Sequence, residues 1–355
     1  MAEIWNKYAN TRARKHGTPG RKARPKSTTV DVHSHIFIKE AAEFSGPHAR
    51  ADLLGQFASA ETQELQKKQN ADRLPVMVEV KQRLKDMDKQ GIDIQLVMCA
   101  PGQCHYSAPL DILVKASQMI NNGIAEFISR APDRFVGLGT VPLTDGNEAA
   151  RELERAMKTF GLKGAQILTN IAGEKEISDP SLEPFWKKAE QLGAVILLHP
   201  NGFTHAHRFK PYYFTNVIGN PLDTTVALHH LIFSGVLERY PKLKIIAVHG
   251  GGYLGAYWGR IDHAWGARSD ARGGLPKPPT TYLKKIYFDT VVFTSEQLKA
   301  LVDAFGVDHV VLGTDYPYDM AEYDPIEHIN SVKSFNAKTR AALAGGNAMK
   351  LLGLG

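Results

Sequence analysis

Short, almost continuously apolar segments recur along the chain, separated mostly by helix-length stretches that are more polar. Eight of these apolar segments are rich in β-branched residues, at 28–35, 92–100, 134–141, 164–169, 194–200, 244–250, 285–291 and 309–315. Strands that are apolar on both faces are typical of a parallel sheet covered on both sides. Stretches between them, such as Asn147–Phe160 and Ser181–Leu192, carry apolar residues at helical spacing. Eight strands alternating with helices predict an α/β fold, a (β/α)8 TIM barrel rather than a doubly wound sheet.

Two insertions interrupt this alternation. Residues 39–80 separate the first strand from its helix, and residues 201–222 follow the fifth strand. Both should distort the C-terminal face of the barrel, where loops build functional sites, so we expect loops that cover the substrate. No internal repeat or low-complexity linker divides residues 28–355, which are therefore predicted to form a single barrel domain.

The net charge of +6 belongs to one end of the chain. Residues 1–27 contain eight Lys or Arg and only Glu3 on the acidic side, a charge of +7, which leaves −1 for the remainder. We predict that this basic segment is an extended arm that is solvated or wraps a neighbouring subunit. No stacking motif or amphipathic pattern accompanies it, so neither nucleic acid nor membrane is expected as a partner.

The cysteine content and the apolar runs bear on the compartment. A chain of 355 residues with only Cys99 and Cys104 lacks a disulfide framework, which favours a reducing compartment. No apolar run approaches the roughly 20 residues of a membrane span, and the first residues lack the apolar core of a secretory signal. We therefore predict a cytoplasmic protein whose two cysteines pack as small apolar residues near a strand end.

Side chains able to bind a metal lie at the ends of four predicted strands. His33 and His35 in VDVHSH are two apart and so face the same side of the first strand. His199 ends the fifth strand, His249 the sixth and Asp315 the eighth. A barrel gathers its strand ends into one ring, so these five residues should converge. Imidazoles with a carboxylate suit Zn²⁺, and also Mn²⁺, Fe²⁺ or Co²⁺.

Two further segments suggest contacts beyond these ligands. His105 follows the second strand and is a candidate for the wall of the site. In HGGGYLGAYWGR, three glycines after His249 are expected to let the backbone approach a ligand and to open a helix. Arg260 would then lie about three turns further along, where it could reach a neighbouring subunit or form an ordinary surface ion pair. The other histidines in loops or helices are interpreted as structural or surface residues: His205, His207, His229, His230, His263 and His309.

The chain resembles the aminocarboxymuconate-semialdehyde decarboxylase family of the amidohydrolase superfamily, over nearly all of residues 28–355. The resemblance is carried by VDVHSH, RFVGLGTVPL, LLHP, KLKIIAVHGGG with the following GR, VVLGTDYP and GGNAMKLLGL. It implies one divalent metal, with zinc as first expectation, held by His33, His35, His199 and Asp315. It further implies that His249 is the acid/base beside the metal. Arg260 would bind a substrate carboxylate in the partner's site, which makes a homodimer the smallest functional unit.

Departures from the family lie around the substrate. Binuclear amidohydrolases often bridge two metals with a carboxylated lysine at the fourth strand, but GAQILT has only Lys163 before it, so a single metal is expected. After the His-Pro of the fifth strand the decarboxylase carries Trp-Asp, whereas this chain has Asn201-Gly202, which makes Asn201 a substrate-binding candidate. Arg50 and Arg73 are loose candidates for its second carboxylate-binding arginine.

The predicted function is metal-dependent, nonoxidative decarboxylation of an aromatic or muconate-type carboxylic acid, as in aromatic degradation. Asp315 or His249 would protonate the carbon that loses CO₂, or His249 would first activate water in a muconate-type route. Hydrolysis of a lactone, amide or ring-cleavage product, and hydration of a diacid, use the same metal and stay open as alternatives. Only decarboxylation releases CO₂.

Overall fold

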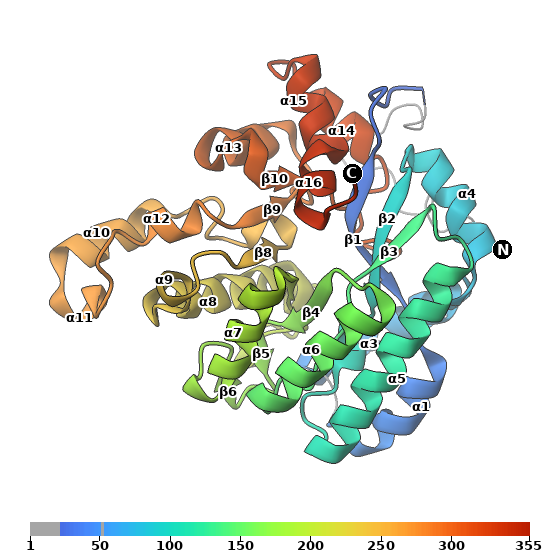
Figure 1. The fold of residues 1–355 in the computed structure, drawn as a ribbon, viewed down its shortest axis with the longest axis horizontal. Coiled ribbons are helices and arrows are strands. Elements are labelled where there is room, and N and C mark those ends of the chain that lie inside the picture. Colours follow the sequence, from blue (N-terminus) through green and yellow to red (C-terminus); the bar gives the residue numbers. More distant parts are fainter. Residues whose placement is uncertain (1–21, 51–52) are drawn as a thin grey trace.

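Eight parallel strands form a closed barrel in the computed structural model, which describes residues 22–50 and 53–355 (Figure 1). Strands β1–β2–β3 pair in one group, and β4, β7, β8, β9 and β10 pair in another. Single bridges between Gly139 and Ala165 and between Ser34 and Tyr316 join the groups and close the ring. The predicted (β/α)8 barrel is therefore confirmed. Its strands are β1 Val30–Ile36, β2 Ile94–Cys99, β3 Phe135–Gly137, β4 Gly164–Leu168, β7 Val195–His199, β8 Lys244–Ala247, β9 Tyr287–Asp289 and β10 Val310–Val311.

Helices cover the outside of the barrel, and their apolar faces supply the larger of its cores. The segments predicted from helical spacing are α6 and α7, and Asp145 caps α6 by accepting from the backbone N–H groups of Asn147 and Glu148. A second core fills the barrel interior with strand residues such as Val32 and Leu197, and α16 contributes to it. The covering helices include α4 Val80–Gln90, α5 Leu110–Ser129, α6 Gly146–Phe160, α7 Glu183–Leu192, α8 Asn220–Phe233, α9 Val236–Arg239, α13 Ser295–Phe305, α14 Pro325–Ser331, α15 Ala337–Ala341 and α16 Asn347–Leu352.

The two insertions differ in structure. Residues 39–80 were expected to be loops, but they fold into α1 Lys39–Ser45, α2 Leu53–Gln56 and α3 Ala60–Val78. The Ser59 side chain caps α3 by accepting from the backbone N–H of Thr62, and the helix packs against β1. Residues 201–219 form irregular chain with a 3₁₀ helix, Ala206–Arg208, and a π-helix, Thr215–Gly219, before α8 begins. A small hairpin, β5 Asn170–Ile171 with β6 Lys175–Glu176, follows β4.

A helical projection extends from the barrel at the left of Figure 1. It consists of α10 Gly259–Ala267, α11 Ser269–Arg272 and α12 Thr280–Leu283. The prediction of a helix running on from His249 was wrong, because the chain makes a short 3₁₀ turn and further turns before α10 starts. Arg260 is therefore an exposed residue of the first turn of α10 and not a point on a continuous helix.

The remaining predictions concern the cysteines, the membrane and the arm. Cys99 and Cys104 are buried free thiols at and just after the end of β2, as predicted. Among the described residues, no helix has both the length and the apolar character needed to cross a bilayer. Most of the predicted arm, residues 1–27, lies outside the described residues; near its end, Arg24 forms an ion pair with Asp93.

Candidate metal centre

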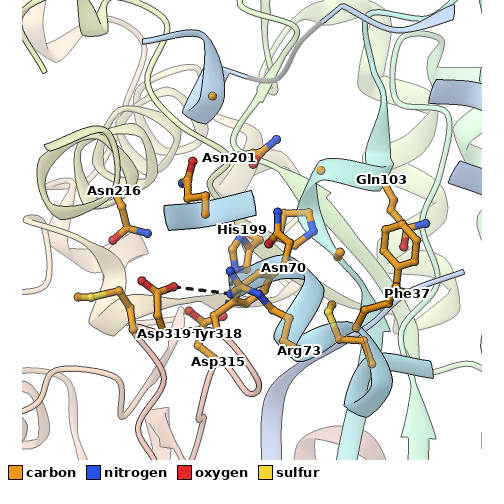
Figure 2. Close-up of a pocket in the computed structure, with 18 of the residues that line it drawn as sticks. Phe37, Asn70, Arg73, Gln103, His199, Asn201, Asn216, Asp315, Tyr318 and Asp319 are labelled. Atoms are coloured by element: carbon orange, nitrogen blue, oxygen red, sulfur yellow. Dashed lines mark ion pairs between the residues drawn. The ribbon is translucent and has the colours of Figure 1, made fainter. Parts of the chain in front are cut away.

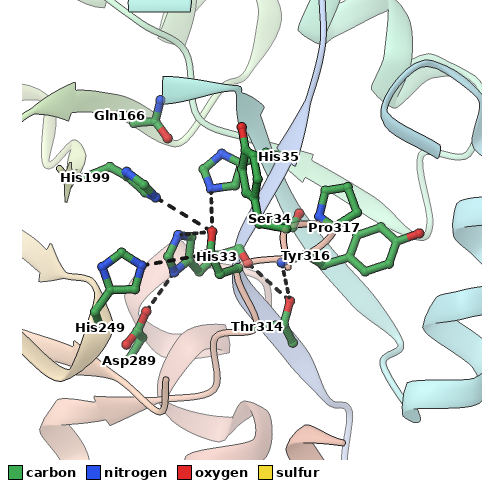
Figure 3. Close-up of polar contacts among 12 residues, drawn as sticks. His33, Ser34, His35, Gln166, His199, His249, Asp289, Thr314, Tyr316 and Pro317 are labelled. Carbon is green, nitrogen blue, oxygen red and sulfur yellow. Dashed lines mark hydrogen bonds and ion pairs between the residues drawn. The ribbon is translucent and has the colours of Figure 1, made fainter. Parts of the chain in front are cut away.

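The structure brings the five predicted side chains together at the C-terminal end of the barrel. His33 and His35 come from β1, and His199 from the end of β7. His249 lies two residues after β8, and Asp315 four residues after β10. Ligand atoms of His33, His199, His249 and Asp315 all lie within 4.8 Å of one another. His35 is outside that group of four, but its Nε2 lies 3.1 Å from Asp315 Oδ1. Figure 3 shows the four imidazoles facing a common centre.

The Asp315 carboxylate is the centre of this cluster. Its Oδ1 lies 3.3 Å from His33 Nε2 and 3.8 Å from His199 Nε2, and its Oδ2 lies 3.5 Å from His249 Nε2. Burial alone would raise the pKa of Asp315, but the surrounding histidines, His33 first, hold that pKa well below its usual range. The backbone is also strained here, since Asp315 has φ 62° and is not glycine. The barrel thus holds an ionised carboxylate in a fixed place.

Three of the histidines are oriented by hydrogen bonds from their other ring nitrogen. His33 Nδ1 lies 2.8 Å from Asp289 Oδ2, His35 Nδ1 3.2 Å from the Cys99 carbonyl oxygen, and His199 Nδ1 2.7 Å from the Pro200 carbonyl oxygen. Carboxylate and carbonyl oxygens only accept, so each Nδ1 donates, and each Nε2 is the ring nitrogen that faces the cluster and can bind a metal once it carries no proton. Metal-binding histidines are usually held in this way.

These residues fit a divalent cation. The buried Nε2 atoms of His33 and His199 have no hydrogen-bond partner among the described residues. Ligand atoms around an ion with bonds of about 2.1 Å stand roughly 3.4 Å apart in a tetrahedral shell, and the ligand atoms of His33, His199, His249 and Asp315 already lie within 4.8 Å of one another. Burial lowers the pKa of His199 to about 3, which keeps that imidazole neutral and able to bind a metal. Burial opposes charge on His33 as well, but Asp315 and Asp289 outweigh it and raise the pKa of His33 to about 10. The site therefore favours a positive charge at its centre.

Asp289 is a supporting residue that the sequence reasoning missed. It ends β9, is fully buried, and binds His33 through Oδ2. Its Oδ1 accepts from the backbone N–H groups of Gly250, at 2.9 Å, and Val291, at 3.2 Å. One carboxylate thus fixes both a cluster histidine and the turn that carries His249. Its position could have indicated a role at the site, since Asp289 lies near the end of the seventh predicted strand.

The glycines after His249 serve packing. Gly250, Gly251 and Gly252 all have φ between 61° and 79°. A Cβ atom on Gly250 would meet Val292 Cγ1 at 2.3 Å, and one on Gly252 would meet the Pro221 carbonyl oxygen at 2.2 Å. Protein atoms therefore already occupy the space that a side chain would need, and the expected approach of this backbone to a ligand stays a prediction. The turn presents His249, whose side chain is 18 % exposed and whose Nδ1 has no hydrogen-bond partner among the described residues.

A cavity of about 610 Å³ opens over the cluster, with His199 and Asp315 in its lining (Figure 2). Both insertions contribute to its wall, and the predicted candidates His105 and Asn201 lie on it. Of the two loose arginine candidates, Arg73 of α3 lines this cavity, whereas Arg50 is exposed and lines a smaller neighbouring one. Further lining residues that the sequence did not single out are Gln66, Asn70, Tyr213, Asn216, Tyr318 and Asp319.

A protein-family model described as Amidohydrolase matches residues 30–354. The chain belongs to the amidohydrolase family. Within it, the chain is 37% identical over 273 residues to 2-amino-3-carboxymuconate-6-semialdehyde decarboxylase of Dictyostelium discoideum, covering 77% of this chain and 76% of the relative. It is 27% identical to gamma-resorcylate decarboxylase of a Polaromonas species, covering 77% of this chain and 86% of the relative.

Solved structures resemble this amidohydrolase in fold. 5-Carboxyvanillate decarboxylase of Novosphingobium aromaticivorans, complexed with manganese and 4-hydroxy-3-methoxy-5-nitrobenzoic acid, superposes with a TM-score of 0.82 at 22% identity. The match covers 95% of this chain and 98% of the other. The predicted family and enzyme class are therefore confirmed: this is a carboxy-lyase of the amidohydrolase family, with a site for a divalent metal.

Proposed function

We propose that this amidohydrolase removes CO₂, without oxidation, from an aromatic or muconate-type carboxylic acid held against one divalent metal. The observation that carries the proposal is the place of the His–Asp cluster, at the floor of a cavity large enough for a substituted ring. The names of two relatives support the substrate class, since one acts on a carboxymuconate semialdehyde and the other on a resorcylate.

His33, His35, His199 and Asp315 would hold the metal. The first three share the same arrangement, with Nδ1 bound to an oxygen and Nε2 aimed at Asp315. Zn²⁺ suits this set, and Mn²⁺ is the ion in the similar 5-carboxyvanillate decarboxylase structure. When bound, the metal polarises substrate oxygens and stabilises the negative charge that develops in the transition state.

His249 is proposed as the acid/base. It differs from the other three histidines because its Nδ1 is unpaired and its side chain is more exposed. When the bond to CO₂ breaks, its electron pair stays on the substrate carbon, which must then take up a proton. His249 lies close enough to the cluster to deliver that proton. Asp315 is the alternative donor for a hydroxybenzoate, once its ionised carboxylate has taken up the proton of the substrate hydroxyl. In a muconate-type route, His249 would instead take a proton from water.

We propose a homodimer in which Arg260 enters the partner's cavity. The projecting α10 leaves Arg260 exposed, and Tyr257 and Trp258 beside it are 67% and 38% exposed. Large exposed aromatic side chains next to an arginine are typical of an interface. Co-expression of Arg260→Ala with His249→Ala tests this, because a mixed dimer contains one intact site. Activity of about a quarter of wild type is expected, and none would contradict the proposal.

We propose a cytoplasmic location. The two buried free thiols support it, because a reducing compartment leaves such cysteines unpaired. Fractionation of the native cells checks this: recovery in the cytosolic fraction is expected, and recovery in a secreted or organellar fraction would contradict it.

A product assay tests the reaction. Metal-loaded and chelator-treated protein would be offered hydroxybenzoates, aminobenzoates and carboxymuconate derivatives, with CO₂ and residual acid both measured. Metal-dependent CO₂ release is the expected result. Metal-dependent loss of a lactone or diacid without CO₂ would overturn decarboxylation in favour of hydrolysis or hydration.

A further inference from the structure

One wall of the cavity holds a buried ion pair that the proposed chemistry does not use. Arg73 Nη1 lies 3.6 Å from Asp319 Oδ1, and their side chains are only 5% and 17% exposed (Figure 2). Arg73 comes from α3 of the first insertion, and Asp319 follows β10, four residues after Asp315. Two segments distant in sequence thus place opposite charges together on the cavity surface.

Tyr318 connects this pair with the metal-binding cluster. Its ring lies under the Arg73 guanidinium, 4.8 Å from centroid to Cζ, and packs edge-on against His35, with 5.1 Å between ring centroids. The ion pair is therefore one aromatic ring away from a cluster histidine. A ring-shaped substrate with its reacting carboxylate at the cluster would extend along this wall, and a substituent on its far side would meet Arg73 and Asp319.

The charges of the wall are already balanced before substrate binds. Arg73 is the only Lys or Arg among the described residues that line the cavity, and Asp319 offsets it. At the cluster, the divalent cation and the Arg260 proposed to enter from the partner would face the reacting carboxylate, which leaves Arg73 as the cation for the far side of the substrate. A second carboxylate at the wall would have to lie beside Asp319 in a largely buried site, where an unpaired like charge is costly.

A neutral hydrogen-bond donor would fit the same place. A hydroxyl or amino group can donate to the Asp319 carboxylate while Arg73 keeps its ion pair, and such a charge-assisted bond is among the stronger ones. The other polar groups of the wall, including Asn70 and Asn216, are uncharged and so do not replace the missing cation.

We propose that Asp319 is a specificity-determining residue that selects monocarboxylic acids carrying a hydroxyl or amino group on the far side, and excludes acids with a second carboxylate there. This inference rests on the proposed function and narrows its substrate class. It is specific to this chain, because it depends on an acidic side chain held against Arg73, the only Lys or Arg that the described residues of one protomer place on the cavity wall.

Binding of unreactive analogues tests the inference without turnover. In 2-nitrophenols a nitro group replaces the reacting carboxylate, so they cannot lose CO₂. Titration calorimetry on metal-loaded full-length protein would compare analogues with a hydroxyl group and analogues with a carboxylate at ring position 4 or 5. Wild type should bind the hydroxyl analogue at least roughly tenfold more tightly than the carboxylate analogue. Equal binding, or tighter binding of the carboxylate analogue, would overturn the inference.

Substitutions connect that preference to Asp319. Asp319→Asn should bring the two affinities within about threefold, because Arg73 becomes available to the second carboxylate. Asp319→Glu keeps the charge and should keep the preference even if Asp319→Asn is too unstable to assay. Asp303→Asn, an exposed aspartate on α13 paired with Lys299, is the matched control and should change neither affinity. An unaltered preference in Asp319→Asn would refute the role of Asp319.

These outcomes separate this inference from the proposed function. Metal-dependent CO₂ release with no preference between analogues would leave the decarboxylase standing and remove only the role of Asp319. Absence of binding by every 2-nitrophenol would overturn both the hydroxybenzoate substrate class and the inference built on it.

Discussion

Replacing Asp289 by Asn should weaken metal binding while leaving the barrel folded. Both carboxylate oxygens accept hydrogen bonds: Oδ2 from His33 Nδ1 at 2.8 Å, and Oδ1 from the backbone N–H of Gly250 at 2.9 Å. An amide of the same shape has only one accepting oxygen, so its NH₂ group must face one of these donors. Either His33 loses the partner that aims its Nε2, or the turn carrying His249 loses its anchor.

The expected decreases in metal affinity and in folding stability follow from the loss of one of these two hydrogen bonds. Removing the partner of a metal-binding histidine typically costs 10- to 100-fold in metal affinity, about 1.4–2.7 kcal/mol. One buried donor left unsatisfied costs a further ~1–3 kcal/mol of folding stability. We therefore expect a Zn²⁺ dissociation constant raised by about one to two orders of magnitude, and a lower melting temperature in the metal-free protein.

Competition with a chromophoric chelator measures the metal affinity, and thermal unfolding with and without metal measures the stability. Asp270→Asn is the control, because Asp270 is an exposed partner of Arg268 and should change neither quantity. An Asp289→Asn variant that binds Zn²⁺ within twofold of wild type would refute the reasoning, since His33 would then need no such partner.

Three further changes have definite expected outcomes. His249→Ala should keep its metal by elemental analysis but lose at least about 100-fold in kcat, whereas unchanged kcat would end its assignment as acid/base. Gly250→Ala forces a Cβ to within 2.3 Å of a Val292 methyl and should lower the melting temperature clearly, whereas Gly259→Ala, which meets no atom within 4 Å, should not. Burial raises the pKa of Asp223 to about 6 in the folded protein, so stability should fall as pH rises from about 4 to 6, by at most about 3 kcal/mol. Asp223→Asn should lessen that fall in denaturant titrations, while Asp31, whose pKa burial also raises to about 6, keeps its own share; a pH profile identical to that of wild type would show that Asp223 does not contribute.

The strand pattern predicted the barrel because the β-segments are almost continuously apolar, as expected of parallel strands that are covered on both faces. Convergence of the metal site follows from the same geometry. Once His33, His199 and Asp315 end parallel strands of a closed barrel, they must share one rim. Residues placed by regular topology were therefore accessible from sequence alone.

Residues placed by the insertions were much less accessible, and Arg73 was only one of two loose candidates. Arg73 is buried in the cavity wall because α3 folds back over β1, and no periodicity in residues 39–80 indicated that packing. The role proposed for Asp319 depends on its ion pair with Arg73, so the sequence around Asp319 could not indicate that role by itself. The three glycines after His249 were recognised from the sequence as a motif. The structure explains them by the close packing of neighbouring atoms around their Cα positions.

Carboxyl-labelled substrate tests the central claim most directly. Metal-loaded protein would be incubated in D₂O with ¹³C-carboxyl hydroxybenzoates and carboxymuconate derivatives, and ¹³CO₂ measured beside a chelated control. The account predicts metal-dependent ¹³CO₂ from at least one acid, with deuterium on the carbon that carried the carboxylate. Metal-dependent consumption of an acid with all of its ¹³C retained in the product would contradict it.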